Sequence, residues 1–284
     1  MTPGTGLERL SLNTATVRGT DLLGMVDACA RAGIPWIAPW RHLLQEVPAE
    51  RAARAIRDAG MRVSSLCRGG FFTAPTEAER QERLEDNRRA IDEAATLGAE
   101  VLVLVCGGVV DKDIRGSRQM VEDGIAAVAP YAAERGVKLG IEPLHPMFAA
   151  DRSVVNTLRQ ANDMAVRIGD ADAGGTGTVG VVVDVYHVWW DPDLEDAIEA
   201  SRGRVLGFHV NDWIVPLPDV LEGRGMMGDG VIELGRLRRA VDAVGYDGPI
   251  EVEIFHQGWW AKPVDEVLAT MVKRYREVVL EPAK

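Results

Sequence analysis

Positive charge is in short supply in this sequence, because 32 Lys and Arg face 43 Asp and Glu and give a formal net charge of −11. Binding to a phosphate backbone relies on clustered lysines and arginines, so we expect no nucleic-acid partner. Long apolar runs are missing too, and residues 1–12 have no basic start followed by an apolar core. We therefore expect no membrane association, no signal peptide and a cytoplasmic location.

Cysteine is scarce as well. The three cysteines, Cys29, Cys67 and Cys106, are an odd number and lack C-x-x-C spacing. This pattern indicates reduced thiols rather than a disulfide framework or a zinc–thiolate motif. Cys67 lies at the end of a strand-like run, where it either lines a pocket or packs as a small apolar side chain.

Histidine occurs only five times, and each one lies at or close to the C-terminal end of an apolar, strand-like run. The runs are WIAPWRH (His42), LGIEPLH (His145), VGVVVDVYH (His187), VLGFHV (His209) and IEVEIFH (His256). Four of them are accompanied by carboxylates, namely Glu142, Asp184, Asp212 and the pair Glu251 and Glu253. In a ring of parallel strands these ends meet at one rim, where barrel enzymes carry their active sites. Carboxylate and imidazole side chains together suit a divalent metal.

The rest of the sequence alternates short strand-like runs with longer helical patterns. The strand-like runs lie near residues 10–17, 36–40, 62–67, 101–108, 138–145, 180–188, 205–212 and 250–255. Gly33 and Gly98 each end a helical pattern shortly before the next strand, as C-terminal caps do. Runs such as VLVLVC are apolar at consecutive positions, which is typical of parallel strands buried on both faces. Eight strand-plus-helix units over residues 1–284 predict an α/β fold, a single-domain (β/α)8 TIM barrel.

An open doubly wound sheet is the alternative architecture. That fold needs a glycine-rich phosphate-binding turn after an early strand, and the first run continues into NTATVRGTD, which has none. The glycine-rich stretch 172–180 precedes a strand instead of following one, so we interpret it as a flexible loop. The long segment after the seventh strand, WIVPLPDVLEGRGMMGDGV, is typical of a functional loop.

Side-chain alternation along the strands selects a smaller set of residues. Because alternate residues share a face, the last four strands can point four side chains inside the rim: Glu142, Asp184, His209 and Glu253. Such an oxygen-rich set suits Mn²⁺ or Mg²⁺ and leaves coordination positions for a sugar's carbonyl and hydroxyl. The ion would stabilise a developing enediolate as a Lewis acid. Glu251 points the same way as Glu253 but one layer deeper, so it is either the true ligand or a paired acid beneath it.

These motifs resemble those of a known group of enzymes. The segments IEPLHP (141–146), VDVYH (183–187), GFHVND (207–212), GMMGDGVIELGRL (225–237) and GYDGPIEVEIF (245–255) are similar to motifs of the sugar phosphate isomerase/epimerase superfamily, the xylose isomerase-like TIM barrels. The resemblance extends over all eight units and is most specific in the last four. The superfamily includes ketose 3-epimerases, hydroxypyruvate isomerase, inosose dehydratase and endonuclease IV-type repair enzymes.

The resemblance implies roles for particular residues. It assigns one divalent metal ion, with Mn²⁺ favoured and Mg²⁺, Co²⁺ or Zn²⁺ as alternatives, to Glu142, Asp184, His209 and Glu253. It further implies that Glu142 and Glu253 form an acid/base pair on opposite faces of the substrate carbon. His187 matches a residue that contacts substrate, and Arg224 is the best match to a substrate-binding arginine in the loop after the seventh strand. A homodimer is implied as well.

Three further residues are candidates. IEPLHPM and the pairs Trp189–Trp190 and Trp259–Trp260 resemble the catalytic subunits of 3-oxo-C-glycoside deglycosidases, in which a histidine can take the proton beside a sugar ketone. His145 is therefore either a catalytic base, an orienting partner of a carboxylate or a pocket-lining residue. Trp189 is a candidate sugar contact, unless the tryptophans pack loops or a subunit interface. His42, expected across the rim from the metal, is a candidate substrate contact.

The leading hypothesis is a metal-dependent isomerase or epimerase that moves a proton α to the carbonyl of a sugar or keto-sugar. The alternative is a lyase in which the same enolate expels a β-substituent, as in inosose dehydratase or a 3-oxo-glycoside deglycosidase; the deglycosidase would need a small partner subunit. A metal-dependent repair nuclease is disfavoured by the few histidines and the charge of −11. A sugar-binding barrel without catalysis is disfavoured because all four metal positions match.

Overall fold

The computed structural model describes residues 6–171 and 177–280. Two predictions fall partly outside this range. Residues 172–176 of the predicted loop 172–180 lie outside the described residues. So do residues 1–5 of the stretch 1–12, in which we expect no signal peptide. Among the residues that are described, no helix is both long and apolar enough to cross a membrane.

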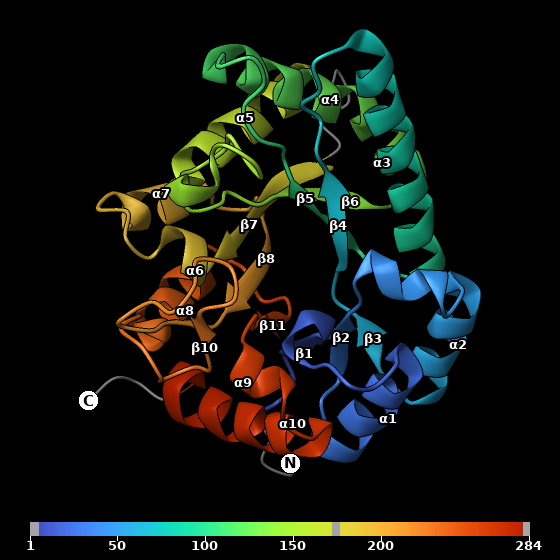
Figure 1. The fold of residues 1–284 in the computed structure, drawn as a ribbon, viewed down its shortest axis with the longest axis vertical. Coiled ribbons are helices and arrows are strands. Elements are labelled where there is room, and N and C mark those ends of the chain that lie inside the picture. The colour runs from blue at the N-terminus through green and yellow to red at the C-terminus, as the bar shows by residue number, and fades with distance from the viewer. Residues whose placement is uncertain (1–5, 172–176, 281–284) are drawn as a thin grey trace.

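Nine parallel strands form a nearly closed barrel in the described part of the chain (Figure 1). In chain order they are β1 (Leu10–Asn13), β2 (Trp36–Ala38), β3 (Arg62–Val63), β4 (Leu66–Gly70), β5 (Val101–Val105), β6 (Lys138–Ile141), β7 (Val179–Asp184), β8 (Val205–Val210) and β11 (Ile250–Val252). Their hydrogen-bonded order is β3-β2-β1-β11-β8-β7-β6-β5-β4. The first strand pairs with the last, so the blue and red ends of the chain lie side by side in Figure 1. The predicted single-domain α/β barrel is confirmed.

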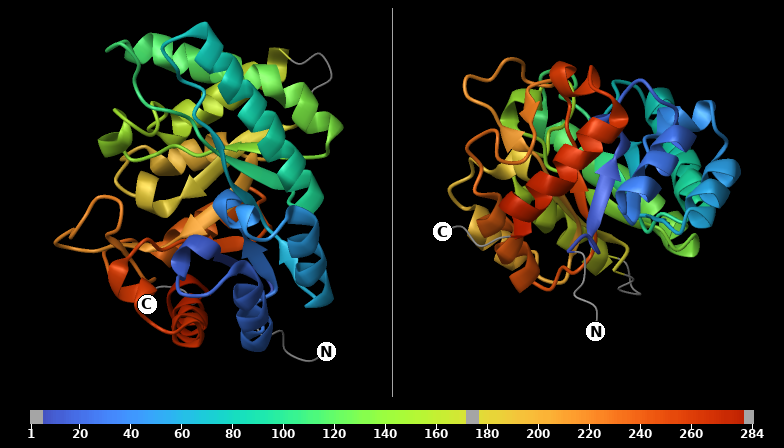
Figure 2. Two further views of the ribbon diagram at one scale, coloured as in Figure 1. Left: turned by 45° about the vertical axis from the view of Figure 1, so that its right-hand side comes forward. Right: turned by 90° about the horizontal axis from the view of Figure 1, so that it is seen from below.

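Helices cover the outside of the barrel, as two further views show (Figure 2). They are α1 (Leu22–Ala32), α2 (Ala49–Asp58), α3 (Glu77–Leu97), α4 (Ile114–Glu134), α5 (Leu158–Ala171), α7 (Leu194–Ala200), α8 (Leu234–Ala243) and α10 (Val264–Arg274). The short helices α6 (Val185–Val188) and α9 (Gln257–Trp260) follow β7 and β11 at the rim. A separate hairpin pairs β9 (Asp212–Trp213) with β10 (Arg224–Gly225). Short 3₁₀ helices lie at η1 (Thr14–Thr16), η2 (Arg41–Gln45) and η3 (Pro146–Phe148), and α10 continues into a π-helix, η4 (Tyr275–Leu280).

The packing follows from the sequence pattern. β5 and β7 are buried along their whole length, because one face of each strand meets the barrel interior and the other meets the helices. α3 begins with a capping box in which the Glu79 backbone N–H donates to the Thr76 hydroxyl. α1 and α3 end at Gly33 and Gly98 in the left-handed conformation, as predicted.

The third predicted strand, near residues 62–67, is two short strands in the structure. β3 pairs with β2, whereas β4 pairs with β5 and carries a register shift between Cys67 and Gly69. An isolated parallel bridge between Trp40 and Cys67 lies at the junction. β2 therefore pairs with the first half of this segment and β5 pairs with the second half, so the barrel stays nearly closed.

The C-terminal end of β4 is fixed by close backbone contacts. Gly70 has φ +105°, and a Cβ there would lie 2.0 Å from the carbonyl oxygen of Val105. The side chain of Asn87 accepts from the Gly70 N–H at 2.6 Å and donates to its carbonyl at 2.8 Å. Only glycine fits this close approach of β4 to β5.

We expect Gly70→Ala to lower the free energy of unfolding by about 3 kcal/mol or more, because it combines a left-handed backbone with a steric clash. Gly98→Ala is the matched control. It also has a positive φ, of +77°, but its Cβ would meet no atom within 4 Å. The control should lose only about 1 kcal/mol. Urea denaturation of both variants tests this difference, and equal losses would contradict the steric explanation.

Candidate active site

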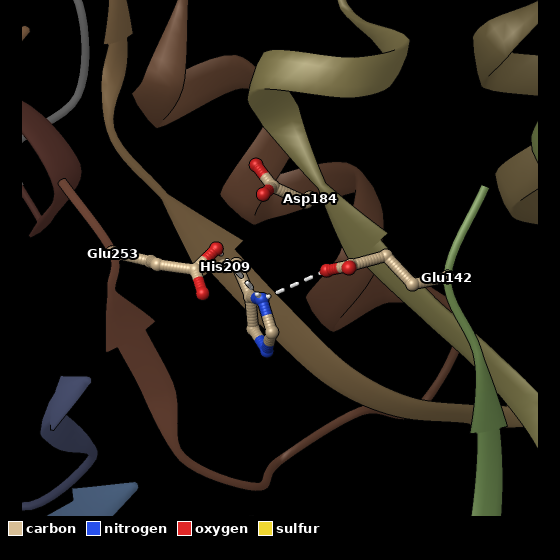
Figure 3. A group of neighbouring side chains, drawn as sticks. All are labelled: Glu142, Asp184, His209 and Glu253. Atoms are coloured by element: carbon tan, nitrogen blue, oxygen red, sulfur yellow. Dashed lines mark ion pairs between the residues drawn. The ribbon is translucent and has the colours of Figure 1, made fainter. Parts of the chain in front are cut away.

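Four of the predicted site residues converge at the C-terminal ends of four neighbouring strands (Figure 3). Glu142 directly follows β6, Asp184 ends β7, His209 lies in β8, and Glu253 directly follows β11. One potential ligand atom from each residue lies within 4.8 Å of those of the others. All four residues are buried, none being more than 4% exposed. The structure thus brings together the whole predicted metal set.

Strand register explains this convergence. Asp184 of β7 is paired with His209 of β8, and His209 is in turn paired with Glu251 of β11. These three residues therefore lie at one level of the barrel and point to its interior. Glu253 lies two residues further along, at the level of the rim.

The His209 ring lies between two groups of carboxylates. Its Nδ1 is 3.1 Å from Glu142 Oε1 and 3.9 Å from Glu253 Oε2, while its Nε2 is 3.4 Å from Glu251 Oε2. Burial alone would lower the pKa of His209, but Glu251, Glu142 and Glu253 outweigh it and raise that pKa to about 10. Glu251 therefore contacts the far side of the imidazole and is not part of the four-residue cluster. This is how a carboxylate orients a ligating histidine.

Arg224, from β10, inserts a positive charge into the cluster. Its Nη1 is 2.8 Å from Asp184 Oδ2 and 2.7 Å from Glu253 Oε2. Burial opposes the ionisation of Asp184, but Arg224, His187 and His209 lower its pKa to about 2. Burial dominates at Glu253 and raises its pKa to about 7 in spite of Arg224. The guanidinium thus partly neutralises two of the four cluster residues.

Two asparagines donate hydrogen bonds to carboxylates at the cluster. The Asn13 side-chain N–H donates to Glu253 Oε1 at 3.1 Å and to Glu251 Oε2 at 3.4 Å. The Asn211 side-chain N–H donates to Asp184 Oδ1 at 3.0 Å. Both asparagines are buried and hold the carboxylates in fixed orientations.

The donor set fits a divalent metal. Glu142 Oε1 and both ring nitrogens of His209 are buried and make no hydrogen bond within the described part of the chain. Buried polar atoms are ordinarily hydrogen-bonded. Glu142 Oε1 and His209 Nδ1 lie 3.1 Å apart on the side of the ring that faces the cluster, so both are available as metal ligands, whereas Nε2 faces Glu251. Three carboxylates and one imidazole are suitable ligands for Mn²⁺, Mg²⁺, Co²⁺ or Zn²⁺. The cluster could therefore hold such an ion.

A cavity of about 130 Å³ lies beside the cluster. Glu142, Glu253, His187 and Arg224 line one part of it. The remaining lining residues are Trp40, Cys67, Arg68, Val105, Leu144, Phe148, Arg152, Leu221 and Phe255. Cys67 fits both of its interpretations, because it lines the cavity and also packs with Val103 and Val182 in a buried apolar cluster. Burial raises the pKa of this thiol. The cavity has room for one small molecule.

His187 and Arg224 present hydrogen-bond donors to this cavity. The His145 backbone N–H donates to His187 Nδ1 at 3.1 Å, which places the proton of the neutral ring on Nε2. Burial is the main cause that lowers the pKa of His187, to about 3, so the ring is neutral. Nε2 lies 3.1 Å from Arg224 Nη2, also a donor. One acceptor oxygen of a bound molecule could satisfy both groups.

The other predicted site residues lie outside the cavity lining. His145 is half-buried between Trp190 and Trp213, with ring centroids 5.4 and 5.2 Å away, and its Nδ1 accepts from the Met147 N–H. Trp189 packs on Trp213 at 5.5 Å. The catalytic role of His145 and the substrate contact of Trp189 stay predictions.

His42 lies in η2 and is exposed. It lines a second hollow with Arg18 and Trp260, and this hollow shares Trp40 and Phe255 with the cavity beside the cluster. The structure therefore places His42 near the cavity but separated from it by two aromatic side chains. Its contact with substrate also stays a prediction.

Sequence reasoning missed three residues of this site. Asn13 and Arg68 both lie near the C-terminal end of a barrel strand, so the positional signal that singled out the histidines was present for them. Neither is a carboxylate or an imidazole, so the chemistry of metal ligation does not mark them. Arg152 lies in the long connection between β6 and α5, where no sequence signal marks it.

The fold and the site define a class of protein. A family model described as xylose isomerase-like TIM barrel matches residues 26–276. The chain belongs to this family, which confirms the resemblance on which its site residues were assigned.

Individual relatives are sugar-modifying and related enzymes. The chain is 28% identical over 260 residues to a 3-dehydroshikimate dehydratase of Pseudomonas putida, covering 89% of this chain but only 39% of that protein. It is 25% identical over 225 residues to L-ribulose-5-phosphate 3-epimerase UlaE of Shigella sonnei, covering 77% of this chain and 72% of the relative. These relationships support an enzyme.

Two solved structures show how widely the architecture is shared. Protein SMc04130 from Sinorhizobium meliloti 1021 is 50% identical, with a TM-score of 0.91 over 96% of this chain and 98% of that one. The IOLI protein, whose structure holds a zinc atom, is 20% identical, with a TM-score of 0.81 over 95% of this chain and 98% of that one. At this level of identity the second similarity concerns the fold alone.

We expect Arg224→Met to lower the free energy of unfolding by about 3–5 kcal/mol in metal-free protein, because it leaves Asp184 and Glu253 buried without their cation. Arg236→Met is the control, since Arg236 pairs with Glu195 and Glu233 on the surface, with the Arg236 side chain 41% exposed. It should cost about 1 kcal/mol or less. Chemical denaturation in the presence of a chelator tests both. Comparable small losses would show that Arg224 does not neutralise the cluster.

Proposed function

We propose that the chain is a divalent-metal-dependent enzyme that transfers a proton α to the carbonyl of a sugar or keto-sugar, with isomerisation or epimerisation as the outcome. One observation carries this proposal. Glu142, Asp184, His209 and Glu253 form a buried cluster beside a cavity, at the end of the barrel where such enzymes place their chemistry. Mn²⁺ is the ion we favour.

The residues divide the chemistry between them. A bound divalent ion would supply Lewis-acid polarisation of the substrate carbonyl. Glu142 lines the cavity and can accept the proton from the carbon next to the carbonyl, while the C–H electron pair moves toward the carbonyl oxygen. Glu253, held by Asn13 and Arg224 on the other side of the cluster, can return a proton to the same or the neighbouring carbon. The donors of His187 and Arg224 can bind substrate oxygens.

A lyase is the second candidate, and the dehydratase relative favours it. After the same proton abstraction, the electron pair of the enolate would expel a hydroxyl from the β-carbon, and that group would leave as water after taking up a proton. The match covers 89% of this chain, but the chain spans only 39% of that relative. A 3-oxo-glycoside deglycosidase, with a small partner subunit, is the variant in which His145 would act as the base.

Metal binding tests the foundation of this proposal. We expect metal-free protein to bind one Mn²⁺ per chain in isothermal titration calorimetry, and Asp184→Asn to abolish measurable binding. Glu251→Gln should weaken binding by about 10- to 100-fold without changing the stoichiometry, because Glu251 orients His209 without joining the cluster. Glu134→Gln, at an exposed position of α4, is the control. Circular dichroism verifies that each variant is folded. Unchanged affinity in Asp184→Asn would exclude the cluster as the metal site.

The acid/base pair is tested by turnover in D₂O. We expect Glu142→Gln and Glu253→Gln to reduce the rate by about 10²–10⁴-fold, as loss of a general acid or base does. Sugar substrates such as L-ribulose 5-phosphate, and 3-dehydroshikimate, represent the two reaction classes. Mass spectrometry separates the outcomes: an isomerase or epimerase product gains deuterium without loss of water, whereas a lyase product has lost one water. Near-normal turnover in both glutamine variants would contradict the assigned roles.

A further inference from the structure

Two arginines line the cavity beside the acidic cluster. Arg68 lies in β4, which the strand order places opposite β8 and therefore opposite His209. Arg152 lies in the connection after β6, and its backbone is held against the end of β5. Both side chains line the same cavity as Glu142 and Glu253. The cavity lining thus holds two arginines, here called the basic wall, as well as carboxylates of the cluster.

The basic wall lacks a strong counter-ion. Within the described part of the chain, the Arg68 guanidinium has no carboxylate at ion-pair distance, and it lies 4.1 Å from the ring centroid of Phe71. Among the described residues, the one carboxylate at ion-pair distance from Arg152 is that of Asp151, at 3.8 Å, and the Asp151 side chain is 67% exposed. Burial, with Arg152 and Arg41 nearby, lowers the pKa of Arg68. A partly buried guanidinium without a counter-ion is unfavourable, so the pair is suited to receive an anion.

The backbone holds both arginines in position. Directly beyond Arg68, Gly70 exchanges two hydrogen bonds with the buried side chain of Asn87. The Gly107 N–H donates to the Arg152 carbonyl at 2.8 Å. Neither arginine is therefore on a loosely attached segment, and a ligand bound between them need not order the main chain.

We propose that the substrate of this site carries an anionic group, a carboxylate or a phosphate ester, that Arg68 and Arg152 bind while the carbonyl end faces Glu142 and Glu253. This inference rests on the proposed function, which places the reacting carbon beside the cluster. The opposite orientation would bring the anion against buried carboxylates. Arg224 would compensate only in part there, because its Nη1 is already shared between Asp184 and Glu253.

The test compares charged and neutral members of two ligand pairs. One pair is L-ribulose 5-phosphate and L-ribulose, and the other is 3-dehydroshikimate and its methyl ester. Equilibrium binding to Mn²⁺-loaded protein is measured by isothermal titration calorimetry for the unaltered chain, Arg68→Gln and Arg152→Gln. Arg62→Gln is the matched control, because Arg62 also lies over an aromatic ring, Trp36, at 3.7 Å but outside this cavity.

We expect the unaltered chain to bind the charged member of one pair more tightly than the neutral member. Arg68→Gln and Arg152→Gln should each lower the affinity for that charged member about 10- to 100-fold, as loss of a charge-assisted hydrogen bond does. Neutral members and Arg62→Gln should show no change. The pair that responds identifies the anion as carboxylate or phosphate. Equal affinity for charged and neutral members, no binding of either charged member, or unchanged affinity in both variants would overturn the proposal.

Failure of this inference is distinguishable from failure of the proposed function. The proposed function fails if Mn²⁺ is not bound at the cluster or if Glu142 proves dispensable for turnover. Neither of those measurements involves Arg68 or Arg152. Conversely, a metal-dependent enzyme that prefers the neutral members would retain its function and lose only the anionic substrate.

Discussion

Negative charge buried at one end of the barrel is the constraint on which the rest of the site depends. Four acidic residues, Glu142, Asp184, Glu251 and Glu253, are each no more than 4% exposed. Burying a carboxylate is costly unless a cation or hydrogen-bond donors accompany it. Arg224 and His209 supply two positive charges, and Asn13 and Asn211 supply amide donors. Carboxylates still outnumber cations, and this imbalance is what makes the cluster suitable for a divalent ion.

The barrel supplies the geometry that makes such a charge density achievable. Parallel strands in register place Asp184, His209 and Glu251 at one level, while Glu142 and Glu253 directly follow their strands. The side chains are thus held by elements with many backbone hydrogen bonds, which resist the repulsion between like charges. Close contacts such as that of Gly70 with Val105 fix the strand ends on the opposite wall. The hydrogen-bonded strands therefore both keep the rim rigid and hold the charged side chains close together.

Much of the fold and of the cluster could be predicted from the sequence, because both depend on local periodicity. The alternation of apolar runs and helical patterns gave the barrel, and side-chain alternation within each run gave Glu142, Asp184, His209 and Glu253. The split of the third strand could not be predicted, since it depends on which neighbour each half pairs with. The positions of His42 and His145 depend on how loops turn beyond the strand ends, and side-chain alternation does not extend into loops. The choice between Glu251 and Glu253 required the strand register.

Arg224 links the acidic cluster to the ligand side of the cavity. Its Nη1 contacts Asp184 and Glu253, and its Nη2 lies against His187, whose Nδ1 is already occupied by a backbone N–H. A change in the charge of the cluster therefore alters the attraction that positions the guanidinium. If the guanidinium moves, the position of Arg224 Nη2 relative to His187 Nε2 changes, and these two groups are the donors available to a bound molecule. The carboxylate cluster and the donors available to a bound molecule are thus not independent parts of the site, because one buried side chain belongs to both.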